Sequence, residues 1–255
     1  MILFNLWGKI KAGNLIAEFF IVTLSVTAAL GGDKYIAHLS TLEQEEVALK
    51  LIHDDLKQNY KHLQWTITEI EREDSVFVNL LRHAAKDTAL SDSTVNAAFK
   101  DFLHFNYFDR TVANVHNYDS KIKNAGKQII QSDSLSNLLA NYYDRKLNNL
   151  TLWTDGRYTM VKDMIHLITQ EGAYLDHGLP YMHKIKGKAF NEVLDGMTSN
   201  VRIMSAVSDQ LWYNEMHIES LSYASVIVSD SITAIEGFFI NKGLEYDPFD
   251  PEDTW

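Results

Sequence analysis

The sequence predicts an all-α fold, in which one N-terminal transmembrane helix continues into a domain of long bundled helices. Three observations lead to this prediction. Residues 15–32 are almost wholly apolar, apolar residues recur at helical spacing through much of the remaining chain, and no proline occurs before Pro180. Because proline in a helix interior costs about 3 kcal/mol, its absence permits very long helices. Period-two alternation is scarce, so we expect no strand.

The composition narrows the class of protein. The 255 residues are 46% hydrophobic and 22% charged, which are ordinary proportions for a folded domain. The net charge of −11 argues against nucleic acid as a partner, because phosphates require a basic surface. The chain contains no cysteine, which excludes disulfides, thiolate nucleophiles and cysteine-bound metal.

The first predicted element is a membrane anchor. Residues 15–32 read LIAEFFIVTLSVTAALGG with Glu18 as the sole charge, and extension over 15–36 gives the length that a bilayer core of about 30 Å requires. Residues 1–14 form a cytoplasmic or interfacial lead-in with two lysines and no acid. The positive-inside rule then predicts a bacterial inner-membrane protein with its N-terminus cytoplasmic and its C-terminal domain periplasmic. A cleaved signal peptide and a buried helix of a soluble protein are the two alternatives.

One side of the predicted span carries small residues and a carboxyl group. At about 100° per residue, Glu18, Ser25, Ala29 and Gly32 fall within about 60° of one another. Small residues let a second helix approach closely, and a carboxyl group in lipid needs a partner. This stripe is therefore a candidate contact face for another membrane protein or a second copy of the chain. The alternative is a glutamate near the interface that is protonated or hydrated.

Residues 37–243 are expected to form the helical bundle domain. Its first helix, a stalk that rises from the span, carries an apolar residue every seven positions, at Leu42, Leu49, Leu56, Leu63 and Ile70. Its last helix is the most regular, since nine of eleven seam positions between Met204 and Phe239 are apolar. Between these two, capping residues predict further helix starts near Asp74, Ser91, Asp109 and Ser132.

A search for catalytic and metal-binding motifs finds none. The ten histidines include no zinc-peptidase or di-iron pair, and no phosphate loop, nucleophile elbow or dinucleotide fingerprint is present. We therefore expect no enzymatic activity and no cofactor. The segment that best fits a ligand pocket is residues 172–188, which brings together Tyr174, His177, Tyr181 and His183. A plain connector is the alternative.

The C-terminal tail, residues 244–255, reads LEYDPFDPEDTW and contains five acids, two prolines and no base. This composition predicts an acidic, flexible and extended tail. Its aromatic residues Tyr246, Phe249 and Trp255 are candidate docking residues for a partner protein. A frayed, solubilising end is the alternative.

Two motifs add to these physical arguments. The first is AEFFIVTLSVTAAL followed by LKLIHDDLKQN, and the second is VHNYDSKIKNAGKQIIQSDSLSNLLANYYD at residues 115–144. Both resemble an uncharacterised bacterial family of N-terminally anchored, single-span, helix-rich proteins of unknown function; in the second, Tyr118, Gly126, Lys127 and Tyr142 match its pattern. The resemblance implies a membrane-tethered helical domain and transfers no catalytic residue.

Together these features favour a membrane-anchored helical protein without enzymatic activity, which binds a partner or scaffolds a membrane-associated assembly. Its expected partners are membrane lipid and either another membrane protein or a second copy of itself. The alternative function is a periplasmic ligand-sensing bundle, which would use segment 172–188 or a pocket between helices.

Overall fold

The computed structural model describes residues 2–104, 113–124, 129–172, 175–178, 182–185 and 190–252. Side chains are described for residues 34–35, 38–98, 101–102, 113–124, 129–167 and 194–252. Within these ranges the chain is helical apart from one two-stranded sheet and the connecting segments. The prediction of a helical architecture is confirmed.

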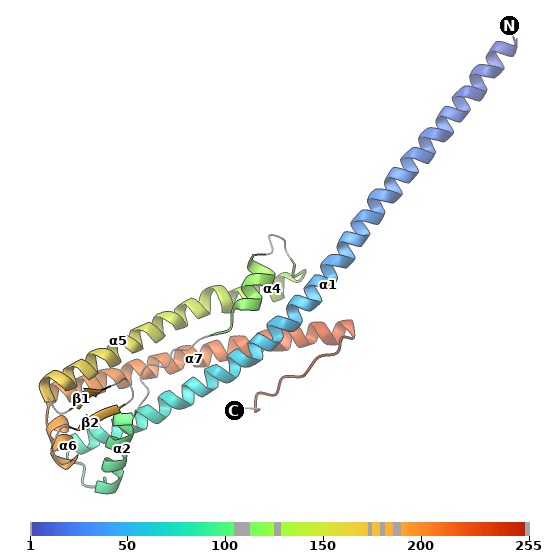
Figure 1. Ribbon diagram of the computed structural model, residues 1–255. Helices are drawn as coiled ribbons and strands as arrows, with labels where there is room; N and C mark the ends of the chain where they lie inside the picture. The colour runs from blue at the N-terminus through green and yellow to red at the C-terminus, as the bar shows by residue number, and fades with distance from the viewer. Residues whose placement is uncertain are drawn as a thin grey trace.

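Helix α1, Ile2–Ala84, is one continuous helix of 83 residues. Its first part projects from the body of the molecule as a rod, and its second part lies along the other long helices (Figure 1). At the point of entry Glu45 is buried and accepts a hydrogen bond from the backbone N–H of Gln131 at 2.7 Å. The predicted helix start at Asp74 is wrong, because Val76, Phe77 and Leu80 continue the buried stripe of α1.

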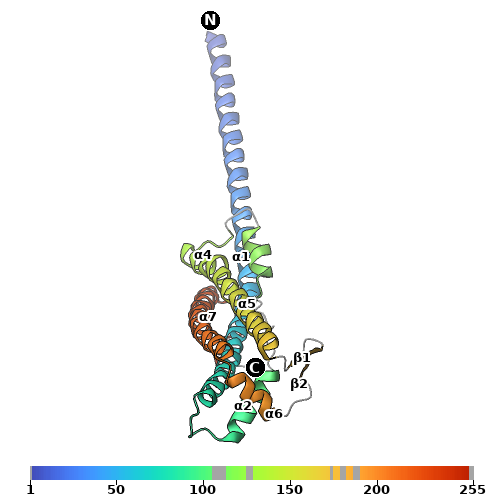
Figure 2. The ribbon, with the colours of Figure 1, turned by 90° about the vertical axis from the view of Figure 1, so that its left-hand side faces the viewer.

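Helix α7, Val201–Lys242, is the central helix of the body, and both α1 and α5, Leu147–Gly172, pack against it (Figure 1, Figure 2). The Asn200 side chain caps its first turn by accepting from the N–H groups of Arg202 and Ile203, and Gly243 ends it at a positive φ of 65°. Most of the predicted seam is buried: Met204, Val207, Asn214, Leu221, Ser225, Val228, Ile232, Ile235 and Phe239. A second apolar surface therefore exists for this helix, as its pattern requires.

Among the residues that the structure describes, α7 is the one helix with the length and apolar composition to cross a membrane. Yet 44% of its apolar window is buried inside the molecule, and its interior face carries Gln210, Asn214 and His217. We therefore interpret α7 as the core helix of the bundle. The predicted span at residues 15–36 is part of α1, but nearly all of its side chains lie outside the described ones, so the anchor remains a prediction.

Shorter elements complete the body. They are α2, Asp92–His104; α3, His116–Tyr118; the π-helical turn η1, Asp119–Lys123; α4, Asp133–Ala140; the π-helical turn η2, Asn141–Lys146; and α6, Phe190–Thr198. Two predicted caps are confirmed, since Ser91 accepts from the N–H of Thr94 and Ser132 from that of Leu135. The predicted start at Asp109 falls outside the described residues.

The expectation that the chain contains no strand is wrong in segment 172–188. Strand β1, Leu175–Gly178, pairs antiparallel with β2, Met182–Ile185, and His177 lies opposite His183. Strands of four residues are too short for period-two alternation to stand out in a sequence. This small sheet lies at the end of the body away from the projecting rod (Figure 1).

The interior consists of two hydrophobic clusters separated by polar side chains. The cluster nearer the rod includes Leu49, Leu56, Tyr142 and Phe239, and the far cluster includes Phe77, Phe102, Met197 and Val207. Between them lies what we call the polar layer: Glu73, Asp74, Arg157, Gln210, Asn214 and His217. These residues come from α1, α5 and α7, so the layer joins all three long helices.

The tail is extended but does not hang free over residues 244–250, which corrects the expectation of a flexible end there. The backbone N–H of Phe249 donates to Glu236 Oε1 at 2.7 Å, and the Phe249 ring lies 4.9 Å from that of Tyr60. Tyr246 packs on His53 and Phe239, with ring centroids 6.1 and 5.4 Å away. The tail therefore straps α1 to α7.

Candidate functional site

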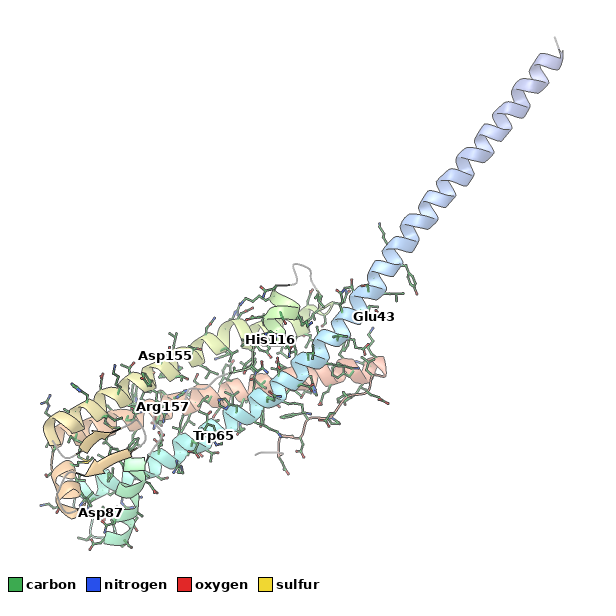
Figure 3. The ribbon with its side chains drawn as sticks, viewed as in Figure 1. Glu43, Trp65, Asp87, His116, Asp155 and Arg157 are labelled. Carbon is green, nitrogen blue, oxygen red and sulfur yellow. The ribbon has the colours of Figure 1, made fainter. Side chains whose placement is uncertain are left out.

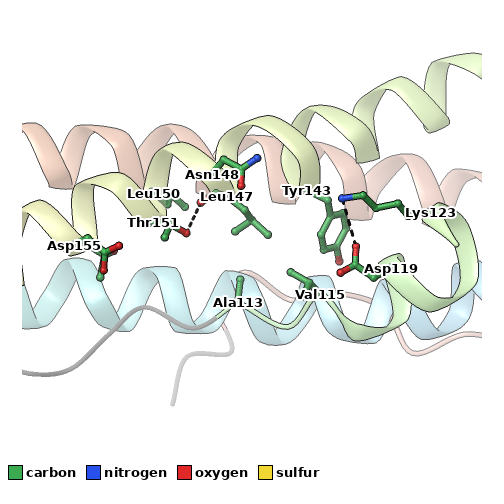
Figure 4. Close-up of a pocket in the computed structure, with 11 residues that line it drawn as sticks. Ala113, Val115, Asp119, Lys123, Tyr143, Leu147, Asn148, Leu150, Thr151 and Asp155 are labelled. Carbon is green, nitrogen blue, oxygen red and sulfur yellow. Dashed lines mark hydrogen bonds and ion pairs between the residues drawn. The ribbon is translucent and has the colours of Figure 1, made fainter.

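A cavity of about 440 Å³ lies between α5 and η2 on one side and residues 113–123 on the other (Figure 4). Its apolar lining is Ala113, Val115, Leu147 and Leu150, and its polar lining includes Asp119, Lys123, Tyr143, Asn148, Thr151, Thr154 and Asp155. The volume falls in the range of small-molecule sites, and the mixture of apolar wall and few polar groups is typical of them. Figure 3 places Asp155 on α5 and His116 nearer the rod, so the cavity occupies this side of the body.

The wall formed by residues 113–118 is held to α1 by two buried side chains. Asn59 makes a reciprocal pair with the backbone of Asn114: it accepts from the N–H at 2.7 Å and donates to the carbonyl at 3.0 Å. Asp55 Oδ1 accepts from the amides of Asn114 at 2.8 Å and Asn117 at 3.0 Å. Burial raises the pKa of Asp55. The cavity wall is thus fixed by side chains 55 or more residues away in the sequence.

Carboxylates outnumber basic groups around this cavity. Lys123 Nζ lies 3.2 Å from Asp144 Oδ1 and 3.9 Å from Asp119 Oδ1, so its charge is already compensated. Asp155 stands at the other end of the cavity from the Asp119–Lys123 pair (Figure 4). Since Lys123 is the one basic residue in the lining, the site has an excess of negative charge.

Two buried hydroxyl groups in the lining have no hydrogen-bond partner among the described residues, those of Tyr143 and Thr154. Tyr143 stacks on Tyr118 with ring centroids 4.2 Å apart, and Tyr118 donates to Asp144 Oδ2 at 3.1 Å. Burial raises the pKa of Tyr143, so its phenol remains protonated near neutral pH. Buried polar groups in folded proteins are seldom unpaired, and such groups mark places where water or a ligand binds.

The polar layer is the other concentration of buried polar groups. Arg157 forms an ion pair with Glu73 and donates from Nε to Asn214 Oδ1 at 3.3 Å. Asn214 also accepts from Gln210 at 2.7 Å and donates to Asp74 at 2.7 Å. His217 is buried beside them, and burial together with the nearby charge of Arg157 lowers its pKa to about 4. These contacts give the layer a structural role in fixing how α1, α5 and α7 align.

The sequence-predicted site residues fall in several places. His177 and His183 face each other across β1 and β2, but their side chains, like all of Tyr174 and Tyr181, lie outside the described residues. The same holds for the side chains of Glu18, Ser25, Ala29 and Gly32. Both pockets and faces proposed for these residues therefore remain predictions.

The predicted docking residues of the tail are divided in the same way. Tyr246 and Phe249 contact α1 and α7 of their own chain, while Trp255 lies outside the described residues. An interaction with a partner through Tyr246 or Phe249 would first require the strap to leave its own helices.

The sequence analysis missed the cavity. A signal was present in part, since Asn148, Thr151 and Asp155 place polar groups on one face of a helix at spacings of three and four. Nothing in the sequence indicated that residues 113–123 would cover that face. Across the parts of the chain whose side chains are described, no cluster of three histidine, aspartate or glutamate residues fits a metal ion. Comparison of the chain with models of protein families, with curated proteins and with solved structures finds no match.

Proposed function

We propose that this protein is anchored in a membrane by residues 15–36 and holds its helical bundle beside the membrane surface to bind a partner. The observation that supports this most directly is the continuity of α1, which runs from Ile2 to Ala84. At 1.5 Å per residue, the helix advances roughly 13–14 Å between residue 36 and Glu45, where the bundle begins. An anchor on this helix would hold the bundle close to the bilayer without a flexible linker.

The proposed location is a bacterial inner membrane, with the N-terminus in the cytoplasm and the bundle in the periplasm. The two lysines before the span and the acid-rich segment after it support this orientation. The resemblance to singly anchored helical proteins of bacteria supports it as well. No enzymatic role is proposed, because no group of side chains was identified that would form a reaction centre.

Membrane extraction tests the anchor. The full chain is expected to remain in the pellet after an alkaline carbonate wash, and its intact mass should include residues 1–36. A reporter that is active only in the periplasm, fused after Trp255, should be active. Recovery of the intact chain in the soluble fraction, or loss of the first residues to a peptidase, would contradict the proposal.

We further propose a second copy of the chain as the partner of the stripe formed by Glu18, Ser25, Ala29 and Gly32. The absence of native cysteine makes a direct test possible. A single cysteine at Ala29 should form disulfide-linked dimers in native membranes, whereas one at Thr27, on the opposite side of the helix, should not. If the two positions cross-link equally or neither does, a specific homodimeric contact through this face is refuted.

A second candidate function, ligand sensing by the periplasmic bundle, is favoured by the cavity beside α5. The site has the size and mixed lining of a small-molecule site and is bordered by helices that connect directly to α1. A ligand that altered the packing of α1 against residues 113–123 would act on the same helix that carries the proposed anchor. Ligand binding to the full chain in detergent is the experiment that tests this function.

A further inference from the structure

We infer that the cavity between α5–η2 and residues 113–123 binds a small organic cation, a primary ammonium group on a short aliphatic chain. This inference names the ligand class for the ligand-sensing function and rests on that proposal. It is independent of whether the chain is anchored in a membrane.

The charges around the cavity select against an anion. Lys123 already lies within 4 Å of two carboxylates, those of Asp144 and Asp119. An anionic ligand would have to displace these carboxylates, and it would also meet Asp155. A cation would lower the repulsion between Asp119, Asp144 and Asp155 instead.

Thr154 supplies a second and independent observation. The neighbouring threonines of α5 satisfy their hydroxyls within the helix: Thr151 donates to the carbonyl of Leu147 and Thr159 to that of Asp155, each at 2.9 Å. Thr154, which is only 8% exposed, makes no such bond, and its Oγ1 has no partner in the described part of the chain. A buried hydroxyl in the cavity wall, next in sequence to a carboxylate, is suited to accept a hydrogen bond from an ammonium group.

The shape of the lining fits the rest of such a ligand. Leu147, Leu150, Ala113 and Val115 form an apolar surface between the Asp155 end and the Asp119 end (Figure 4). The aromatic ring of Tyr143 stands in the wall near Asp119, where it would offer its face to a second cationic group or to methylene groups. An aliphatic chain with an ammonium group at one end or at both ends would satisfy all three regions.

Calorimetric titration of the full chain in detergent, with four probes of similar length, tests the inference. The probes are n-butylamine, 1,4-diaminobutane, the neutral 1,4-butanediol and the anionic butanoate. Saturable binding is expected for at least one amine, and the diol and butanoate should bind at least tenfold more weakly. The affinity should fall as the salt concentration rises, because the site's charges are partly exposed.

Two site variants and one control complete the test. Asp155→Asn and the nearly isosteric Thr154→Val should each weaken amine binding by about tenfold, which corresponds to the loss of one charge-assisted hydrogen bond. Asp209→Asn, on the exposed face of α7, removes the same charge away from the site and should bind as the unaltered chain does. Circular dichroism verifies that each variant is folded; Thr154→Val alone decides if Asp155→Asn is not.

The inference is overturned if no amine binds saturably, if the diol or butanoate binds as tightly as the amines, or if folded Thr154→Val binds like the unaltered chain. Such a result leaves the anchoring proposal untouched, because carbonate extraction measures that separately. Saturable binding of butanoate alone would preserve the ligand-sensing function while refuting a cationic ligand.

Discussion

Arg157 of α5 and Glu73 of α1 form an ion pair inside the bundle, at the boundary between its two hydrophobic clusters. Their side chains are only 10% and 7% exposed, and Arg157 also donates to Asn214 of α7. Burial raises the pKa of Glu73 even though Arg157 favours its charged form. Because a buried charge without its partner is costly, this pair restricts the three helices to one relative alignment.

Loss of one member of that pair should therefore be severe. We expect Arg157→Met to lower the free energy of unfolding by about 3–5 kcal/mol, because it leaves the carboxylate of Glu73 buried and unpaired. The double variant Arg157→Met with Glu73→Gln should recover part of that loss. Arg72→Met, which breaks an exposed pair with Glu69, should change stability by less than about 1 kcal/mol. Denaturant unfolding followed by circular dichroism measures all three; equal effects at residues 72 and 157 would contradict this account.

Gly156 and Gly237 provide a matched pair of helix-interior glycines. A Cβ atom at Gly156 would lie 1.9 Å from the hydroxyl oxygen of Tyr213, which donates to the carbonyl of Trp153 at 3.0 Å. A Cβ atom at Gly237 would have nothing within 4 Å. We expect Gly156→Ala to destabilise the protein by about 1–3 kcal/mol through overpacking. Gly237→Ala should stabilise it by about 0.5–1 kcal/mol through helix propensity.

Thermal unfolding of the two alanine variants checks this contrast. Adding Tyr213→Ala to Gly156→Ala removes the clash, so the effect of the alanine should become smaller in that background. If Gly156→Ala costs the same with and without Tyr213, the close approach of the two residues does not explain the glycine.

His217 should make stability depend on pH. Burial holds its folded-state pKa at about 4, below the ordinary value of 6.5. The unfolded chain therefore binds the proton more readily, and the contribution of His217 is complete above pH 6.5 and lost as the pH falls toward 4. The full loss is about 3 kcal/mol. Asp74 acts in the opposite direction, since burial raises its pKa to about 6 and its contribution is lost as the pH rises through that value.

Variants separate these opposing contributions. In His217→Leu the stability should no longer include the acid-side loss, so the difference from the unaltered chain should change by about 3 kcal/mol between pH 7 and pH 4. In Asp74→Asn the opposite change is expected. Denaturant unfolding at several pH values gives both differences, with the exposed His38→Gln as the control. A pH-independent difference for His217→Leu would show that this histidine does not titrate as proposed.

The tail strap should contribute measurably to stability. Phe249→Ala removes the ring that packs on Tyr60 and should lower the free energy of unfolding by about 1–2 kcal/mol. It should also speed proteolytic cleavage in the segment that follows Gly243. Glu252→Ala, an exposed position beyond the ring contacts, is the control and should leave both measurements unchanged. Identical cleavage rates for the two variants would indicate that the strap is not held by Phe249.

The long helices could be predicted because their signals are local and repetitive. The apolar seams of α1 and α7 recur over many turns, so Leu49, Leu56, Val228 and Phe239 were recognisable as interior residues from spacing alone. Caps at Ser91 and Ser132 were readable for the same reason, since a cap depends on residues only three positions apart. The start predicted at Asp74 failed because a residue suited to capping is also tolerated within a helix when packing holds the chain helical.

The cavity and the tail strap could not be predicted, because each depends on groups that are distant in the sequence. Asn114 meets Asn59, and Phe249 meets Glu236 and Tyr60, only once the helices are assembled. The acids and prolines of the tail indicated mobility, since composition does not reveal a complementary surface elsewhere in the chain. Lys57, which pairs with Asp247, supplies part of that surface.

By itself the sequence determined that this chain would form long helices, where their apolar faces lie, and that a strongly apolar segment precedes the first of them. Periodicity and propensity are properties of neighbouring residues, so they are fixed before any helix meets another. Only the tertiary structure decided that Arg157 would find Glu73, that residues 113–123 would roof one face of α5, and that the acidic tail would return to α1. Those outcomes depend on the free energy of burying specific polar groups together, which no local pattern records.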